Sequence, residues 1–199
     1  MDKYPEIAVK RKTGSEQFHE NGKSLDDNLL SFWQWSASDL VGNAMRGILA
    51  EYIVATAVNR ADNNRTEWDS YDIETSEGIK VEVKSCAYIQ SWSQKKLSSI
   101  QFGIRPTQGW DSKNNSYTNK VERQSDVYVF CVLNHKEQNT IDPLNLKQWF
   151  FYVLPTEVLN KSVGDQKTIT LSSLIQLSPI EAEYVEVYAS IQKAANKAN

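Results

Sequence analysis

Apolar side chains recur every three or four residues across residues 39–59, which is the periodicity of a helix with one apolar face. Arg46 and Glu51 interrupt the segment, so it does not resemble a membrane span. Gly47, Glu51 and Ala55 are spaced four residues apart and share one stripe of this helix. Small neighbours would let that stripe approach a sheet closely and leave one carboxylate projecting from the contact. A solvent-exposed Glu51 beside a merely tolerated Gly47 is an equally good interpretation.

Shorter segments later in the chain have the composition and length of β-strands. They cover residues 71–75, 79–85, 98–105, 126–133 and 148–154. The run VYVFCVL in the fourth segment is apolar at every position, which is typical of a strand buried on both faces. Ser178-Pro179-Ile180-Glu181 has an N-cap serine, a proline at the first helical position and a glutamate at the third, so a C-terminal helix is predicted to begin there. Together these patterns predict an α/β domain with helices on both faces of a sheet.

The chain shows no internal repeat and no linker that would divide it, and its 199 residues suffice for one sizeable core. We therefore expect a single domain over residues 1–199. Residues 1–38 would form an N-terminal arm or cap, residues 39–160 the core, and residues 161–199 a helical cover. The polar stretch 108–122 is predicted to be a long loop or lid.

Charge is distributed unevenly, although the formal net charge is only −3. Acidic residues dominate between positions 62 and 78, and basic residues dominate between positions 79 and 124. An acidic pocket beside a basic surface would suit a metal site next to a polyanion. The alternative interpretation is that these charges only solvate two surface regions.

Cys86 and Cys131 lie far apart and form no C-x-x-C pair, so neither a zinc site nor a disulfide framework is indicated. The N-terminal residues contain no apolar run of the signal-peptide type, and no later stretch has the length and apolarity of a membrane span. We expect a cytoplasmic protein that does not bind membranes.

The candidate site is the charged segment YDIETSEGIKVEVKS, residues 71–85. If residues 76–78 form a three-residue loop, with Gly78 in the left-handed conformation, Thr75 pairs with Ile79. Counting outward, Asp72 then faces Glu82, and directly opposed Cβ atoms lie roughly 4.5–5.5 Å apart. A two-residue loop would remove this pairing, so the hypothesis depends on the register.

Two opposed carboxylates can share one divalent cation, and Mg²⁺ suits an all-oxygen site with few protein ligands. By strand alternation Lys84 points to the same face as Glu82, while Val81 and Val83 point into the core. A cation held in this way would neutralise phosphate charge, and the ammonium would orient an attacking water. The pattern therefore favours phosphodiester hydrolysis.

Asp72, the following Glu82-Val83-Lys84 and the upstream Arg46-Gly47-x-x-x-Glu51 resemble the active site of the PD-(D/E)xK nuclease superfamily. The stretches RGILAEYIV, WDSYDI, VEVKS and SDVYVFCVL are similar to an uncharacterised bacterial group of that superfamily. The resemblance implies a restriction endonuclease-like fold, in which a central mixed β-sheet is flanked by helices. It also implies a helix between the third and fourth core strands, but residues 91–125 show no helical pattern.

The resemblance further implies a Mg²⁺-dependent DNA endonuclease of restriction, defence or repair, with Mn²⁺ as a possible substitute. Asp72 and Glu82 would bind the metal, Glu51 would join the metal site, and Lys84 would act on the water. Some branches use a glutamine shortly after the lysine, for which Gln90 is the candidate. Duplex cutters of this fold are often homodimers.

The basic segment after Lys84 would follow the DNA backbone, with contacts from Lys95, Lys96, Arg105 and Lys113. Trp92 and Trp110 lie among these residues and could stack on bases, although packing is the commoner role of tryptophan. Two other classes remain open. One is a catalytically inactive, nuclease-like module that binds nucleic acid or protein, and the other is a structural α/β domain whose charged strands are solvated.

Overall fold

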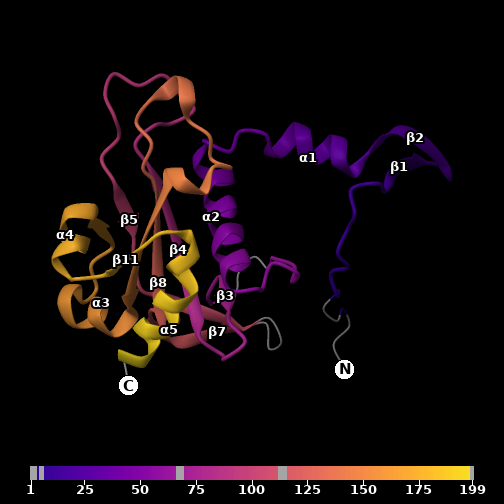
Figure 1. Ribbon diagram of the computed structural model, residues 1–199. Coiled ribbons are helices and arrows are strands. Elements are labelled where there is room, and N and C mark those ends of the chain that lie inside the picture. The colour runs from indigo at the N-terminus through magenta and orange to yellow at the C-terminus, as the bar shows by residue number, and fades with distance from the viewer. Residues whose placement is uncertain (1–3, 5–6, 66–69, 112–115, 198–199) are drawn as a thin grey trace.

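The computed structural model describes residues 4, 7–65, 70–111 and 116–197, and its centre is a mixed five-stranded sheet (Figure 1). The strand order is β11-β9-β8-β4-β3. These strands are β3 (Ile73–Glu74), β4 (Lys80–Ala87), β8 (Val127–Leu133), β9 (Trp149–Pro155) and β11 (Ile180–Ala182). β4 and β8 run parallel, and the other neighbours pair antiparallel. The prediction of an α/β protein with a mixed central sheet flanked by helices is confirmed, and the architecture is consistent with a restriction endonuclease-like fold.

Both faces of the sheet are covered, and β8 is therefore buried along its whole length. Val127, Val129 and Cys131 face one apolar cluster, which α2 (Asn43–Ala57) and α5 (Val187–Lys197) complete. Tyr128 and Phe130 face a second cluster. That cluster includes residues of β10 (Thr168–Thr170), β5 (Gln101–Gly103), α3 (Thr156–Val163) and α4 (Leu171–Gln176). The continuous apolar run of β8 thus follows from two covered faces.

The remaining elements are peripheral to this core. They are β1 (Gln17–Glu20), β2 (Lys23–Asn28), α1 (Leu29–Ala37), β6 (Thr107–Asp111), β7 (Ser116–Glu122), and the 3-10 helices η1 (Gln138–Thr140), η2 (Leu146–Gln148) and η3 (Tyr184–Glu186). The β1–β2 pair and α1 extend away from the sheet (Figure 1). α1 begins at Asn28, which forms a reciprocal capping box with Ser31.

The predicted helix start at residues 178–181 is wrong. Ile180–Ala182 is strand β11, which pairs antiparallel with β9, and Ser178 has a positive φ of 56° in the turn after α4. The true helix follows η3, where Glu183 and Glu186 form the capping box. The same local signature is also compatible with a strand. The edge of β9 would otherwise have unpaired backbone N–H and C=O groups, and residues 180–182 form a strand because they hydrogen-bond to these groups. A C-terminal helix is present as predicted, and its residues Val187 and Ile191 are fully buried.

Two further expectations are corrected. α2 packs on β4 through residues such as Ala50 and Val54, whereas a Cβ added to Gly47 would meet no atom within 4 Å. Gly47 is therefore not what permits the close approach of helix and sheet. The stretch expected to be a loop or lid holds the antiparallel β6–β7 pair, in which Trp110 lies opposite Tyr117. The described parts of residues 91–125 contain strands and no helix.

Arg123 ties three of these segments together at the edge of the second cluster. Its buried guanidinium donates to the carbonyl oxygen of Ile104 at 2.7 Å and to Oδ1 of Asn160 at 2.7 Å. It also donates to the carbonyl oxygens of Gly164 at 2.9 Å and Gln166 at 3.2 Å. The segment before β6 is thereby fixed to α3 and to the turn that follows it.

We expect Arg123→Met to lower the free energy of unfolding by about 2 kcal/mol or more, because buried carbonyl acceptors lose their donor. Urea denaturation would measure the change. Arg105→Met is the matched control, since Arg105 is exposed, and its effect should stay within about 0.5 kcal/mol. Equal effects of the two substitutions would contradict the role assigned to Arg123.

Candidate active site

The turn between β3 and β4 has three residues, as predicted. Ile73 pairs with Val81 and Glu74 with Lys80, and the Thr75 N–H donates to the Ile79 carbonyl at 3.0 Å. Gly78 has a φ of +80°, the left-handed conformation that favours glycine at such a position. This register, continued by one pair, brings Asp72 opposite Glu82.

The backbone of β4 also orients Asp72. β3 ends at Ile73, and beyond it the Asp72 N–H donates to the Val81 carbonyl at 3.0 Å. The carboxylate Oδ2 of Asp72 then accepts from the N–H of Val83 at 2.6 Å. One oxygen of the carboxylate is thus tied to the sheet.

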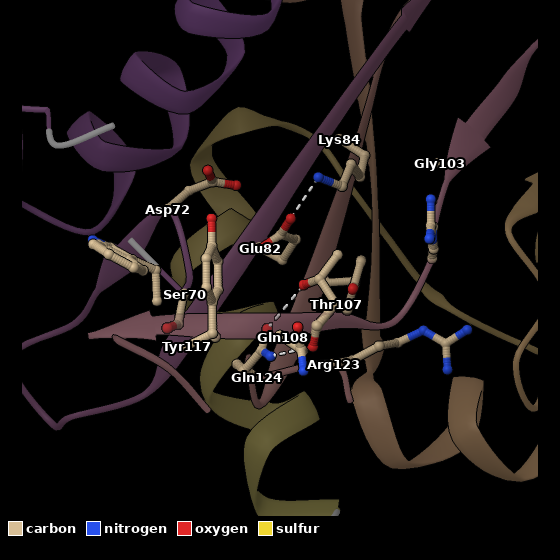
Figure 2. A pocket seen from close by; sticks show the side chains of 14 residues that line it. Ser70, Asp72, Glu82, Lys84, Gly103, Thr107, Gln108, Tyr117, Arg123 and Gln124 are labelled. Carbon is tan, nitrogen blue, oxygen red and sulfur yellow. Dashed lines mark hydrogen bonds and ion pairs between the residues drawn. The ribbon is translucent and has the colours of Figure 1, made fainter. Parts of the chain in front are cut away.

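Asp72, Glu82 and Lys84 project into one cavity of about 510 Å³ (Figure 2). Nζ of Lys84 donates to Oε1 of Glu82 at 2.5 Å. The cavity lies on the face of the sheet that carries Tyr128, which is directly beside Glu82 in the parallel β4–β8 register. The other walls include Arg105 and the β6–β7 pair. The structure therefore brings together the three side chains that the sequence placed at the centre of the site.

The electrostatics of this cavity disfavour a charged Asp72. Solvent reaches the side chain through the mouth of the cavity, but the surrounding protein desolvates the carboxylate and raises its pKa to about 7. The negative charges of Glu82 and Glu51 raise the pKa further, and the Val83 hydrogen bond and the Lys84 ammonium oppose the shift. Asp72 thus sits where an additional positive charge would be favourable.

Glu51 lies near this acidic pair but is engaged elsewhere. Its carboxylate accepts from Nε of Arg65 at 2.5 Å and from Nη2 of Arg65 at 3.2 Å, and its side chain is 17% exposed. It does not line the cavity, although its charge acts on Asp72. The structure thus places Glu51 beside the proposed metal ligands with Arg65 as its ion-pair partner.

The donor set fits a magnesium ion that keeps water and substrate in its coordination shell. Within the described part of the chain, no group of three or more His, Cys, Asp or Glu side chains is arranged to hold a metal. Mg²⁺ often binds through one or two carboxylates together with substrate phosphates and waters, which Asp72 and Glu82 would satisfy. Glu51 would have to release Arg65 to become a third ligand.

Gln90 occupies a different environment from the acidic pair. It is buried, its Oε1 accepts from Nη1 of Arg46 at 3.1 Å, and its Nε2 donates to the Ala87 carbonyl at 2.8 Å. Arg46 is also buried and donates to the Val41 carbonyl at 2.7 Å. Gln90 does not line the cavity, so its contacts favour a structural link between α2 and the end of β4.

The predicted DNA contacts are divided in space. Arg105 is exposed and lines the cavity. Lys95 and Lys96 are exposed in the segment between β4 and β5 and do not line it. Lys113 lies outside the described residues.

Tyr128 and Tyr117 also line the cavity, and the sequence interpretation had assigned neither a function. Burial and the charge of Glu82 raise the pKa of the Tyr128 phenol, so this side chain keeps its proton. Tyr128 carries a hydroxyl within the otherwise apolar run of β8, and this signal could have identified it from the sequence. Tyr117 had no such signal, because β7 is exposed along most of its length.

The mixed sheet, with Asp72 opposite Glu82 and Lys84 beside Glu82 on the same strand, is consistent with an α/β protein of restriction endonuclease-like architecture. The family model described as "Bacteriophage T4 endonuclease IV" matches residues 1–173. The chain belongs to this family, which supports a nuclease. No curated protein matches the chain. None of the described helices has the length and apolarity needed to cross a membrane.

The raised pKa of Asp72 predicts a pH-dependent stability. In its usual state an aspartate is deprotonated above about pH 4, whereas folded Asp72 still holds a proton up to about pH 7. The folded protein therefore binds more protons than the unfolded chain in this window, and the contribution of Asp72 to stability is lost as pH rises from 4 to 7. In metal-free buffer, the Tm of Asp72→Asn should therefore rise relative to the Tm of wild type as the pH increases from 5 to 8.

Asp165→Asn is the matched control, because Asp165 is an exposed aspartate that does not line the cavity. Its Tm difference from wild type should not follow this pH course. A Tm difference for Asp72→Asn that stays constant from pH 5 to pH 8 would contradict the raised pKa.

Proposed function

We propose that this protein is a Mg²⁺-dependent endonuclease of the PD-(D/E)xK type that hydrolyses phosphodiester bonds in DNA. The observation that carries the proposal is the placement of Asp72 opposite Glu82, with Lys84 beside them in one cavity. Membership in a family named after an endonuclease supports it independently. We expect the protein to act in the cytoplasm, in restriction, defence or repair.

The residues divide the chemistry between them. Asp72 and Glu82 hold the divalent ion, and Mn²⁺ would fit the same oxygen donors. When bound, the ion supplies positive charge against the phosphate. The Lys84 ammonium orients the attacking water and stabilises the negative charge that develops in the transition state. For this, it must share or leave its contact with Glu82 when substrate enters. Glu51 supports the site from α2.

DNA would reach the cavity along its basic rim. Arg105 lines the cavity and would contact a phosphate next to the cleaved one. Lys95 and Lys96, which do not line the cavity, would contact the backbone further out. Lys113 stays a predicted backbone contact. Such contacts are largely independent of sequence and weaken as salt rises.

A catalytically inactive binding module is the second candidate, and one observation favours it. Lys84 already neutralises Glu82, and Arg65 already neutralises Glu51, so these carboxylates have partners without a metal. Asp72 has no such cationic partner among the ion pairs of the described residues, and this difference favours the nuclease.

The test is cleavage of supercoiled plasmid by purified protein with Mg²⁺, with Mn²⁺ and with chelator. We expect nicking and linearisation with either metal, and Lys84→Ala should reduce the rate by a factor of about 100 or more, comparable to the loss of one transition-state hydrogen bond donor. Lys147→Ala is the control, because Lys147 is remote from the cavity in η2.

Each other result has a defined meaning. DNA binding without cleavage under every metal would support the binding module. Cleavage that survives Lys84→Ala would remove the proposed role of that lysine. Absence of both binding and cleavage would contradict the whole proposal.

We further infer that the protein is a homodimer, since cutting both strands of a duplex needs two sites. α1 supports this inference, because none of its nine residues is buried although it carries Phe32, Trp33 and Trp35, the last 84% exposed. A helix this short is marginal in water without packing. Ile48 and Tyr52 form an exposed apolar pair at i, i+4 on α2, the helix that follows α1 along the chain.

Light scattering coupled to size exclusion should give twice the 22.7 kDa chain mass for the wild type. Combined Phe32→Ser and Trp35→Ser should yield a monomer, because the exposed aromatic residues of α1 would be lost from the interface. Val185→Ser, which alters an exposed valine beside α5, should leave the mass unchanged. A monomeric wild type at tens of micromolar would refute the dimer.

A further inference from the structure

The cavity extends beyond the acidic pair, and its far wall is built from the β6–β7 pair. Gln108, Trp110 and Tyr117 line this wall, and in Figure 2 the hydroxyl of Tyr117 is directed toward the carboxylate end of the cavity. The proposed chemistry uses none of these side chains. A volume of about 510 Å³ is within the usual range for a small-molecule site and is large enough for one nucleotide.

Tyr117 presents an open aromatic surface in this wall. Trp110 and Tyr117 are cross-strand partners whose ring centroids lie 4.7 Å apart at an interplanar angle of 60°, an edge-to-face arrangement. Trp110 is half-buried, whereas Tyr117 is 61% exposed. The contact with Trp110 therefore holds the tyrosine ring in place and leaves much of its surface free.

Hydrogen bonds hold the two strands of the wall together, and β6 lies close to the segment just before Asp72. Nε2 of Gln124 donates to the Thr107 carbonyl at 2.6 Å, and the Gly109 N–H donates to Oγ1 of Thr118 at 3.0 Å. A Cβ on Gly109 would lie 3.1 Å from Oγ of Ser70, so the glycine lets β6 approach the segment just before Asp72. An aromatic surface fixed in this way loses little conformational freedom on binding a flat ligand.

We infer that Tyr117, supported by Trp110, stacks on the nucleobase adjacent to the cleaved phosphate. The inference rests on the proposed function, because it takes the acidic pair as the place of cleavage. Arg105, in the wall at the other side, contacts the next phosphate of the same strand. The β6–β7 pair thus positions one nucleotide across Asp72 and Glu82, and Tyr117 is a substrate-binding residue rather than a part of the metal site.

A purely structural pair of rings is the competing explanation, since cross-strand aromatic pairs also stabilise strand pairing. The two explanations differ in one measurable respect. Stacking makes binding depend on the presence of a base at one position of the DNA. A structural pair affects all DNA ligands equally.

The experiment is an abasic scan carried out without cleavage. Lys84→Ala protein is titrated with fluorescent 12-nucleotide DNA in which each residue in turn is replaced by a tetrahydrofuran abasic residue, in Mg²⁺ buffer. The DNA is presented alone and annealed to its complement, and fluorescence anisotropy gives Kd. The same series is measured for Lys84→Ala combined with Tyr117→Ala, with Tyr117→Phe or with Phe18→Ala.

At one position the abasic residue should weaken binding by about tenfold to a hundredfold. This factor corresponds to the loss of stacking between one base and one aromatic side chain. Tyr117→Ala should reduce this ratio to below about threefold, while Tyr117→Phe should retain it. Phe18→Ala should also retain the ratio, because Phe18 is an exposed aromatic residue of β1 that does not line the cavity. Thermal melting of each variant verifies that it is folded.

An unchanged ratio in Tyr117→Ala would overturn the inference, as would equal weakening of intact and abasic DNA or a scan with no base-dependent position. These results leave the proposed nuclease untouched if the wild type cuts DNA. A wild-type protein that neither binds nor cuts DNA would instead overturn the proposed function.

Discussion

The rest of the site depends on the hydrogen-bonded register of β3 and β4. The turn at residues 76–78 sets this register, and Gly78 allows the turn. Because side chains alternate along a strand, a slip of one residue would exchange the two faces of β3. Asp72 would then leave Glu82, and Ile73 would leave the first apolar cluster. Core packing therefore selects the register that also brings Asp72 opposite Glu82.

This arrangement places negative charge where the protein tolerates it poorly. Asp72 is desolvated and has Glu82 and Glu51 as neighbours, so its pKa rises to about 7. Two nearby cationic side chains are paired with the other two carboxylates, Lys84 with Glu82 and Arg65 with Glu51. Perturbed titration in a cavity is typical of functional sites, because the same unfavourable charge that costs stability favours the binding of a cation.

Local sequence rules predicted the structure correctly where a sequence pattern is compatible with only one conformation. The loop length followed from the position of Gly78, and β8 followed from its apolar run. They failed at residues 178–181, where a helix-cap signature forms the edge strand that completes the sheet beside β9. They also failed for the β6–β7 pair, whose mostly exposed residues have no periodic apolar pattern.

The candidate site was predictable to the same extent. Asp72, Glu82 and Lys84 lie within a short segment, so counting residues was enough to place them together. The partners of Glu51 and Gln90 depend on Arg65 and Arg46, and no spacing rule specifies side-chain contacts of that kind. Tyr117 lines the cavity through the tertiary placement of the β6–β7 pair, which no local pattern specifies.

The parallel pairing of β4 with β8 has a consequence for the order of assembly. The turn that joins β3 to β4 closes over three residues, and hairpins of this type form in about 1–10 μs. Val81, by contrast, pairs with Val127, and contacts at such long sequence separation form slowly. During synthesis, the two carboxylates can meet as soon as β4 has left the ribosome, but the wall that carries Tyr128 is added only when β8 follows. Asp72 and Glu82 can thus come together before the cavity around them is complete.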